Sequence, residues 1–184
     1  RNCTGCALPQ WIEAPADSAA EVARALLSPI GTPPLAELAK GKQKVAIVTS
    51  DITRPMPSAV VLPLVLDELY RAGVCPESVT VVFALGSHRR QTEEEKLHLA
   101  GEEVYRQVTC VDSLDFDFVH MGDTEARHPG WISAARWRRR DLRICLGNIE
   151  YHYFVGYSGG AKAIMPGVPT GPRSQANHSY TGQT

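Results

Sequence analysis

The sequence lacks a strong excess of either charge and lacks any long hydrophobic run. Its 184 residues carry 19 Lys and Arg against 20 Asp and Glu, for a net charge of −1. A nearly neutral chain gives no electrostatic indication of nucleic acid or an anionic membrane as a partner. None of its apolar runs approaches the roughly 20 residues that cross a bilayer. With 43% hydrophobic residues, the composition is typical of a soluble globular protein.

The chain also lacks an even, closely spaced set of cysteines, since its five cysteines are widely scattered. An odd number at such spacing does not indicate a disulfide framework and favours a reducing compartment, the cytoplasm. Cys3 and Cys6 form a C-x-x-C pair, but one pair without a second is a weak indication of a metal or redox site. The chain starts with neither a methionine nor a signal-peptide pattern, which suggests that it begins inside a longer protein.

What the sequence does contain is an alternation of short apolar runs and helical spacing. Strands are predicted at residues 45–48, 79–85, 108–111, 116–121 and 142–146. Helices are predicted at residues 19–27, 35–39, 58–72, 92–107 and 131–140. Such alternation is typical of βαβ units. We therefore predict an α/β fold with a Rossmann-like parallel sheet flanked by helices. Residues 1–40 are expected to form an extension with short helices, and residues 41–184 the α/β domain.

Three loops rich in polar residues follow three of the predicted strands, at residues 50–55, 86–90 and 147–162. In open parallel sheets, ligands bind at the carboxyl ends of the strands. The loops carry side chains that a turn does not require: Asp51, Arg54, His88, His152 and Lys162. We expect these five side chains to converge at one edge of the sheet.

The first loop has a structural and a functional interpretation. Asp51 or Thr53 can cap a helix that starts after Pro55. Arg54 is harder to explain structurally, because a guanidinium just past a strand can bind a phosphate or a carboxylate through two hydrogen bonds.

The second loop carries His88, which follows a buried strand and precedes a helix. Histidine can act as a general base near neutral pH. The neighbouring Arg89 and Arg90 are expected to disfavour the protonated imidazole through like-charge repulsion.

The third loop contains the run Ser158-Gly159-Gly160-Ala161-Lys162, which is similar to a phosphate-binding loop but lacks the Walker spacing. A lysine in a glycine-rich, partly apolar loop can have a lowered pKa and form a covalent link to a cofactor. His178, further along, offers an imidazole of the kind that binds nickel and similar metals. No cysteines or carboxylates accompany it, so any metal there must take most of its ligands from elsewhere.

These motifs, taken in order, resemble the lactate racemase family, whose members use a nickel-pincer nucleotide. The resemblance runs from about residue 30 to the end and includes residues 50–55, 86–89, 150–167 and Asn177-His178. It implies that Lys162 carries the cofactor through a thioamide bond. It also implies that His178 binds the nickel, whose other ligands are two sulfurs and a carbon of the cofactor.

The resemblance further implies that His88 and His152 flank a 2-hydroxy acid and act in turn as base and acid on its hydroxyl. The cofactor takes a hydride from the neighbouring carbon and returns it to the other face. A cofactor is needed as electron sink because that C–H bond is very weakly acidic. The residues expected to bind the cofactor, or to orient the substrate or the catalytic histidine, are Asp51, Thr53, Arg54, Ser158, Gly159, Gly160 and Lys162.

Two departures from the family pattern bear on this hypothesis. Family members have two domains, so we expect this chain to be the N-terminal domain, without the C-terminal one. Residues 168–173 contain two prolines and a glycine, which delay the helix expected before His178. The expected partners are a small 2-hydroxy acid and the enzymes that build the cofactor.

Two other functions remain open at this point. The first is a non-catalytic nucleotide- or phosphate-binding domain of the same fold. The second is a hydrolase or lyase that uses His88 and His152 with an ordinary divalent metal, although neither histidine has carboxylate ligands nearby in the sequence.

Overall fold

The computed structural model of the chain describes residues 17–115, 118–123, 129–133, 139–152, 156–164 and 167–168. For residues 118–123 and 129–133 it describes the backbone alone. His178 and the Cys3–Cys6 pair lie outside the described residues, so the predictions made for them stay predictions.

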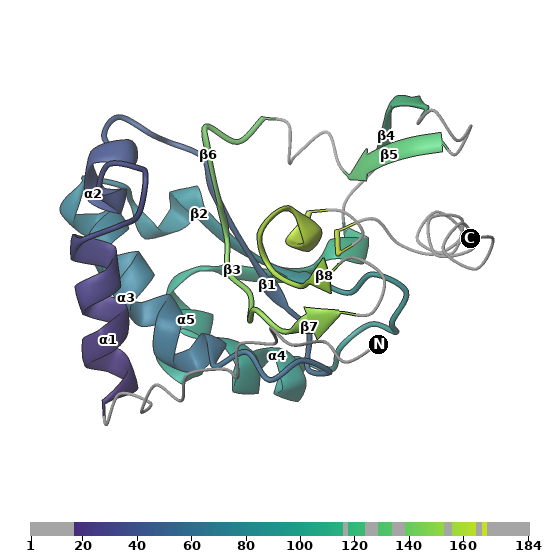
Figure 1. Cartoon of the computed structure of the whole chain (residues 1–184), viewed down its shortest axis with the longest axis horizontal. Coiled ribbons are helices and arrows are strands. Elements are labelled where there is room, and N and C mark those ends of the chain that lie inside the picture. Colours follow the sequence, from purple (N-terminus) through teal and green to yellow (C-terminus); the bar gives the residue numbers. More distant parts are fainter. Residues whose placement is uncertain are drawn as a thin grey trace, which may run out of the picture.

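A four-stranded parallel sheet forms the centre of the molecule (Figure 1). Its strands are β1 (Val45–Ser50), β2 (Val79–Ala84), β3 (Thr109–Asp112) and β6 (Leu142–Cys145), in the order β3-β2-β1-β6. Each neighbouring pair is parallel. The first five residues of both β1 and β2 are buried, as expected for runs of β-branched residues covered on both faces. The predicted α/β fold with a parallel sheet flanked by helices is confirmed.

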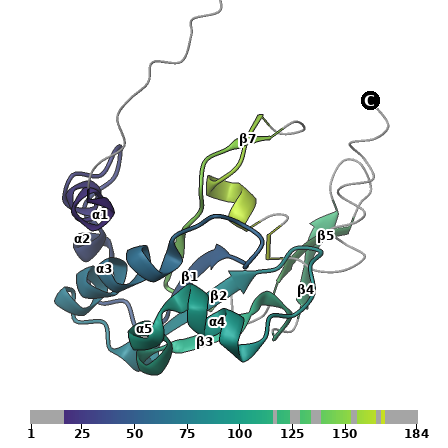
Figure 2. The ribbon, with the colours of Figure 1, turned by 90° about the horizontal axis from the view of Figure 1, so that it is seen from below.

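The helices of the described chain pack on one face of this sheet. They are α1 (Ser18–Leu27), α2 (Leu35–Leu38), α3 (Ser58–Arg71), α4 (Glu93–Ala100) and α5 (Glu102–Gln107). Alternate strand residues such as Ile47 and Val81 join helix residues such as Leu66 in the main core. The opposite face, including Val48, packs against Val168 and the 3₁₀ helix η3 (Gly160–Ala163). Figure 2 shows η3 across the sheet from α3, α4 and α5.

The strand order creates a crevice at the carboxyl end of the sheet. From β1 the chain passes through α3 to β2 and through α4 and α5 to β3, then returns to form β6 on the other side of β1. The loops that follow β1 and β6 therefore leave in opposite directions. In open α/β sheets, ligands bind at such a reversal of strand order.

Two predicted elements differ from the structure. Residues 92–107 form two helices rather than one, because Gly101 has a φ of 80° and interrupts the helical ladder between α4 and α5. The start of this segment is as predicted. The Thr92 hydroxyl accepts a hydrogen bond from the Glu95 N–H, and the Glu95 carboxylate accepts one from the Thr92 N–H.

The helix predicted at residues 131–140 is wrong over its described start. Residues Pro129–Ser133 form β5, which pairs antiparallel with β4 (Phe118–Asp123) in a separate two-stranded sheet. An aromatic residue and a β-branched residue, Trp131 and Ile132, favour a strand once a partner strand is available. The strand predicted at 116–121 thus exists as β4, two residues further along.

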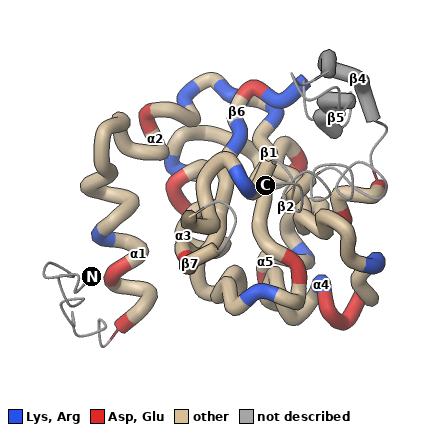
Figure 3. Tube along the Cα trace, turned by 45° about the vertical axis from the view of Figure 1, so that its right-hand side comes forward, with Lys and Arg blue, Asp and Glu red and all other residues tan. Residues whose placement is uncertain are grey.

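Acidic and basic residues are both spread over the described elements (Figure 3). Among the described residues, no helix has the length and apolar character needed to cross a membrane. The α1 and α2 helices lie against α3, and Leu26 and Leu35 pack against the main core. The division of the chain at residue 40 stays a prediction.

Candidate functional site

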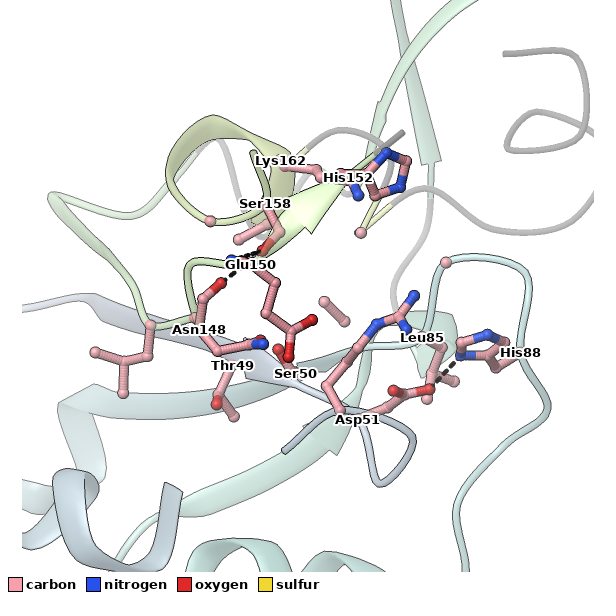
Figure 4. Close-up of a pocket in the computed structure, with 18 of the residues that line it drawn as sticks. Thr49, Ser50, Asp51, Leu85, His88, Asn148, Glu150, His152, Ser158 and Lys162 are labelled. Carbon is pink, nitrogen blue, oxygen red and sulfur yellow. Dashed lines mark hydrogen bonds and ion pairs between the residues drawn. The ribbon is translucent and has the colours of Figure 1, made fainter. Parts of the chain in front are cut away.

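A cavity of about 720 Å³ opens at the carboxyl ends of β1, β2 and β6. Its lining includes all five side chains that were expected to converge: Asp51, Arg54, His88, His152 and Lys162. They come from the loops after three adjacent strands, and Figure 4 labels all of them except Arg54. The parallel sheet therefore brings together residues that lie up to 111 positions apart (162 − 51). Their chemical roles stay predictions.

The imidazole of His88 is paired with the carboxylate of Asp51. The distance between His88 Nδ1 and Asp51 Oδ2 is 2.5 Å. The Asp51 side chain is only 4% exposed, whereas the His88 side chain is 41% exposed. The other oxygen of Asp51 accepts hydrogen bonds from the Thr53 N–H, at 3.2 Å, and from the Thr53 hydroxyl, at 2.7 Å. The buried carboxylate is thus held by its own loop and holds the histidine of the next one.

This pairing fixes which ring nitrogen of His88 carries a proton. A carboxylate only accepts hydrogen bonds, so Nδ1–H must donate to Asp51. In the neutral imidazole, Nε2 is then the acceptor and can receive a proton. Neither Asp51 nor Thr53 caps α3, whose N-cap residue, Pro57, has no side-chain hydrogen bond. The helix-capping interpretation of this loop is therefore wrong for α3, and the functional interpretation stays a prediction.

Both arginines next to His88 form ion pairs with other side chains, and their expected repulsion of a protonated His88 stays a prediction. Arg89 donates two hydrogen bonds to Glu95, at 2.7 and 2.8 Å, and holds the pKa of Glu95 at about 2. Arg90 forms an ion pair with Asp115. The charged group in direct contact with the His88 ring is the Asp51 carboxylate.

The third loop forms a small hairpin that carries His152. Its strands are β7 (Tyr151–His152) and β8 (Gly156–Tyr157), and His152 pairs with Gly156 across them. Ser158 closes the base of the hairpin: its hydroxyl accepts from the Glu150 N–H and donates to the carbonyl oxygen of Asn148, both at 2.8 Å. The hydroxyl proton of Ser158, a predicted cofactor ligand, is therefore used within the chain.

Lys162 lies in η3, just after Gly159 and Gly160, and is partly buried. Burial, and secondarily the positive charge of Arg54, lower the pKa of Lys162, while the carboxylate of Glu150 acts in the opposite direction. The lowered pKa that we expected for this lysine is confirmed in direction. A larger fraction of uncharged amine makes Lys162 a better nucleophile than a solvated lysine.

Gly167 is a residue of the site that the sequence reasoning missed. Its carbonyl oxygen accepts a hydrogen bond from the Gly86 N–H at 2.8 Å, which joins the Lys162 segment to the loop of His88. A Cβ atom at position 167 would lie 2.4 Å from the carbonyl oxygen of Ala163, so a side chain does not fit there. The Met-Pro-Gly end of the motif could have indicated such a close approach.

Asn148 is the second missed residue. It lines the cavity, and its side-chain nitrogen is buried with no hydrogen-bond partner among the described residues. Figure 4 shows the side chain directed toward the carboxyl end of β1. A buried donor without a partner is costly, so this nitrogen is available to a ligand that carries an acceptor atom.

The described residues contain no group of three or more His, Cys, Asp or Glu that could hold a metal ion. An ordinary divalent metal site with side-chain ligands, as a hydrolase or lyase would need, is therefore not found within the described ranges.

The sequence matches the model of the family "Lactate racemase N-terminal domain" over residues 1–183. The chain belongs to this family. The lactate racemase of Lactiplantibacillus plantarum is 36% identical to it over 162 residues, which cover 86% of this chain and 38% of that protein. The lactate racemase of Thermoanaerobacterium thermosaccharolyticum is 38% identical over 160 residues, which cover 85% of this chain and 37% of that protein. The chain thus spans less than two fifths of these curated relatives.

Solved structures agree with the family assignment. The lactate racemase apoprotein from T. thermosaccharolyticum matches with a TM-score of 0.76 and 36% identity, over 87% of this chain and 39% of that one. A crystal structure of a Thermotoga maritima protein matches with a TM-score of 0.65 over 87% of this chain and 40% of that one. At 20% identity the second match shows the fold alone. The fold expected of a lactate racemase N-terminal domain is confirmed.

Proposed function

We propose that this chain supplies the cofactor-tethering half of the active site of a 2-hydroxy acid racemase or epimerase, an isomerase. The observation that carries the proposal is the shared cavity: His88 and His152, from loops on either side of β1, line it together with Lys162. Two relatives at 36% and 38% identity are lactate racemases, which supports the reaction class.

The residues at the cavity fit a nickel-pincer nucleotide bound through Lys162. The lysine has a lowered pKa and so can form an acyl-type bond through its amine. The side-chain nitrogen of Asn148, which has no partner within the described ranges, offers a buried donor to the nucleotide, and Arg54 offers a cation. Asp51, Thr53, Gly159 and Gly160 complete the proposed cofactor surroundings, and His178 is the proposed nickel ligand. When bound, such a cofactor accepts and returns a hydride.

The chain's own residues supply the proton transfers. Because Nδ1–H of His88 donates to Asp51, Nε2 is the atom that takes the substrate hydroxyl proton. His152 performs the same step from the other loop. One imidazole therefore removes the hydroxyl proton of the enantiomer that enters, and the other donates a proton to the hydroxyl oxygen of the enantiomer that leaves. Asp51 stabilises the positive charge that His88 gains. Arg54 is the residue suited to the substrate carboxylate or to a phosphate of the cofactor.

The partners proposed are a small 2-hydroxy acid and the enzymes that build the cofactor, and the proposed location is the cytoplasm. The wide spacing of Cys75, Cys110 and Cys145, all free thiols, is in keeping with a reducing compartment.

Intact-protein mass spectrometry tests the tether. Protein produced together with the cofactor-building enzymes is expected to carry an adduct and nickel, and Lys162→Arg is expected to carry neither. Arginine keeps the positive charge but cannot form the bond. An unmodified Lys162 in protein made under these conditions would contradict the proposal.

A second measurement tests catalysis. His88→Ala is expected to lower racemisation about 10²- to 10⁴-fold while the adduct remains, because a general base is lost. His98→Ala, on the exposed side of α4, removes a histidine away from the cavity and should leave the rate unchanged. Wild-type protein that carries the adduct and also contains the other half of the active site, but racemises no 2-hydroxy acid, would instead support the non-catalytic nucleotide-binding domain.

A further inference from the structure

Behind the Asp51–His88 pair lies a second, fully buried set of polar side chains. Gln91 is 7% exposed, and Asp112 and Ser113 are not exposed at all. Gln91 ends the loop of His88, whereas Asp112 is the last residue of β3 and Ser113 follows it. Buried polar groups in proteins nearly always have hydrogen-bond partners, so the partners of these three side chains indicate what the side chains do.

Their hydrogen bonds join the ends of three strands. The Asp112 carboxylate accepts from the Gln91 N–H at 3.0 Å and from Gln91 Nε2 at 3.2 Å. Gln91 Oε1 accepts from the N–H of Ile52 at 2.9 Å. The Ser113 hydroxyl accepts from the N–H of Leu85 at 3.2 Å. Because β3 and β1 are separated by β2 in the sheet, Gln91 reaches across β2 to hold the loop after β1.

We propose that Gln91 and Asp112 are positioning residues that hold the Asp51 and His88 loops in register for proton transfer. The inference rests on the role proposed above for His88. The peptide N–H held by Gln91 is the one that follows Asp51, so the bond fixes the backbone from which that carboxylate projects. The loop of His88 is anchored at its start, Leu85, by Ser113 and at its end, Gln91, by Asp112, two neighbouring residues at the carboxyl end of β3. Asp51 and His88 are thereby both held in position by the rigid carboxyl end of β3.

The hydrogen bonds that Gln91 makes with Asp112 and Ile52 form a clamp between the strand ends, and their directions allow a sharp test. Gln91 presents two donors to Asp112 and one acceptor to Ile52. The Asn side chain in Asp112→Asn has only one oxygen, so its NH₂ group must face one of the two N–H donors of Gln91. In Gln91→Glu, two carboxylates face each other.

The double variant, Gln91→Glu with Asp112→Asn, restores the complementarity. The new carboxylate at position 91 accepts from the Ile52 N–H and from the new amide N–H at position 112. The amide oxygen at position 112 accepts from the backbone N–H of residue 91. All three bonds therefore return at unchanged net charge, one of them with its direction reversed.

Kinetics and amide exchange on the cofactor-loaded protein distinguish the outcomes. Each single variant is expected to lower kcat about 10- to 100-fold, with a smaller change in KM, because misplaced catalytic groups slow the chemistry more than binding. Protection of the Ile52 N–H from solvent exchange should fall in the single variants and recover, with kcat, in the double variant. Gln107→Glu, the same change on the exposed surface of α5, is the matched control.

Single variants with wild-type kcat and wild-type Ile52 protection overturn the proposal, as does a double variant no better than the single ones. If a single variant fails to fold, folding of the double variant supports the matched bonds, and its failure overturns them. Wild-type protein that carries the Lys162 adduct and also contains the other half of the active site, but is inactive, refutes the proposed function alone. The exchange measurement then still decides whether the clamp exists.

Discussion

Replacing Asp51 with Asn removes the acceptor that fixes the proton on His88. The two hydrogen bonds from Thr53 both go to Oδ1, so the variant keeps them on its remaining oxygen. The amide nitrogen then occupies the position of Oδ2, 2.5 Å from His88 Nδ1 in the native protein. Two donors cannot share that contact, and the Thr53 hydroxyl oxygen, 3.3 Å from Nδ1, is a weaker acceptor than the lost carboxylate, so the tautomer without a proton on Nδ1 is favoured. Nε2 then carries the proton and can no longer act as the base.

Two magnitudes decide what this substitution does. Exchanging a charge-assisted hydrogen bond for a neutral one costs about 1 kcal/mol, which a domain stable by about 5–15 kcal/mol tolerates. The wrong tautomer costs far more in rate. The corresponding change in a serine protease lowers kcat about 10⁴-fold, and loss of a general base typically costs about 10²- to 10⁴-fold. That range equals about 2.7–5.4 kcal/mol of activation free energy. We therefore expect a folded protein with little racemase activity.

The assay combines racemisation rate with nitrogen NMR of the histidine ring. The adduct on Lys162 is first verified by mass, so that loss of activity cannot be confused with loss of cofactor. In the native protein the proton should reside on Nδ1 of His88, and in Asp51→Asn on Nε2. Asp67→Asn, the same substitution on the exposed face of α3, is the control. Wild-type turnover in Asp51→Asn, or an unchanged tautomer, would refute the reasoning.

Two further predictions concern the segment of Lys162. Labelling of Lys162 in apoprotein by an amine-reactive reagent should rise with pH. The profile should shift to higher pH in Arg54→Met and to lower pH in Glu150→Gln, because Arg54 lowers and Glu150 raises the pKa of Lys162. Shifts in the reverse order would contradict this electrostatic account. Gly167→Ala should destabilise the protein by about 1–3 kcal/mol, measured by urea unfolding, because its Cβ meets the Ala163 carbonyl. An unchanged unfolding midpoint would show that the segment can move.

The convergence of the three loops could be predicted because it depends on a simple rule of parallel sheets. Continuous β-branched runs identified β1 and β2, and every loop that follows such a strand leaves from the same edge. The reciprocal hydrogen bonds between Thr92 and Glu95 at the start of α4 could also be predicted, because they need only two residues at a fixed spacing. Features that depend on one strand or one short spacing are therefore readable from the chain.

The remaining features depend on partners distant in sequence. Pairing of Asp51 with His88 requires that β1 and β2 are neighbours and that each side chain points toward the other from its loop. The β5 strand was missed because Trp131 and Ile132 adopt it only against β4. The part that Gln91 plays could not be seen either, because its two partners are 39 and 21 positions away. An exposed glutamine and a buried one look the same in a sequence.

The strand order also explains why two imidazoles can serve one substrate. His88 follows β2 and His152 follows β6, and β1 lies between these strands. Neighbouring strands lie about 4.8 Å apart, so β2 and β6 are roughly 9.6 Å apart at the edge of the sheet. For the racemase proposed above, that separation leaves room over the end of β1 for a small hydroxy acid with a base on each side. Had β6 joined the sheet beside β3, the order would be β6-β3-β2-β1, and the loops of His88 and His152 would flank β3 instead of β1. The loop of Asp51 and Arg54, which follows β1, would then lie outside the two histidines rather than between them.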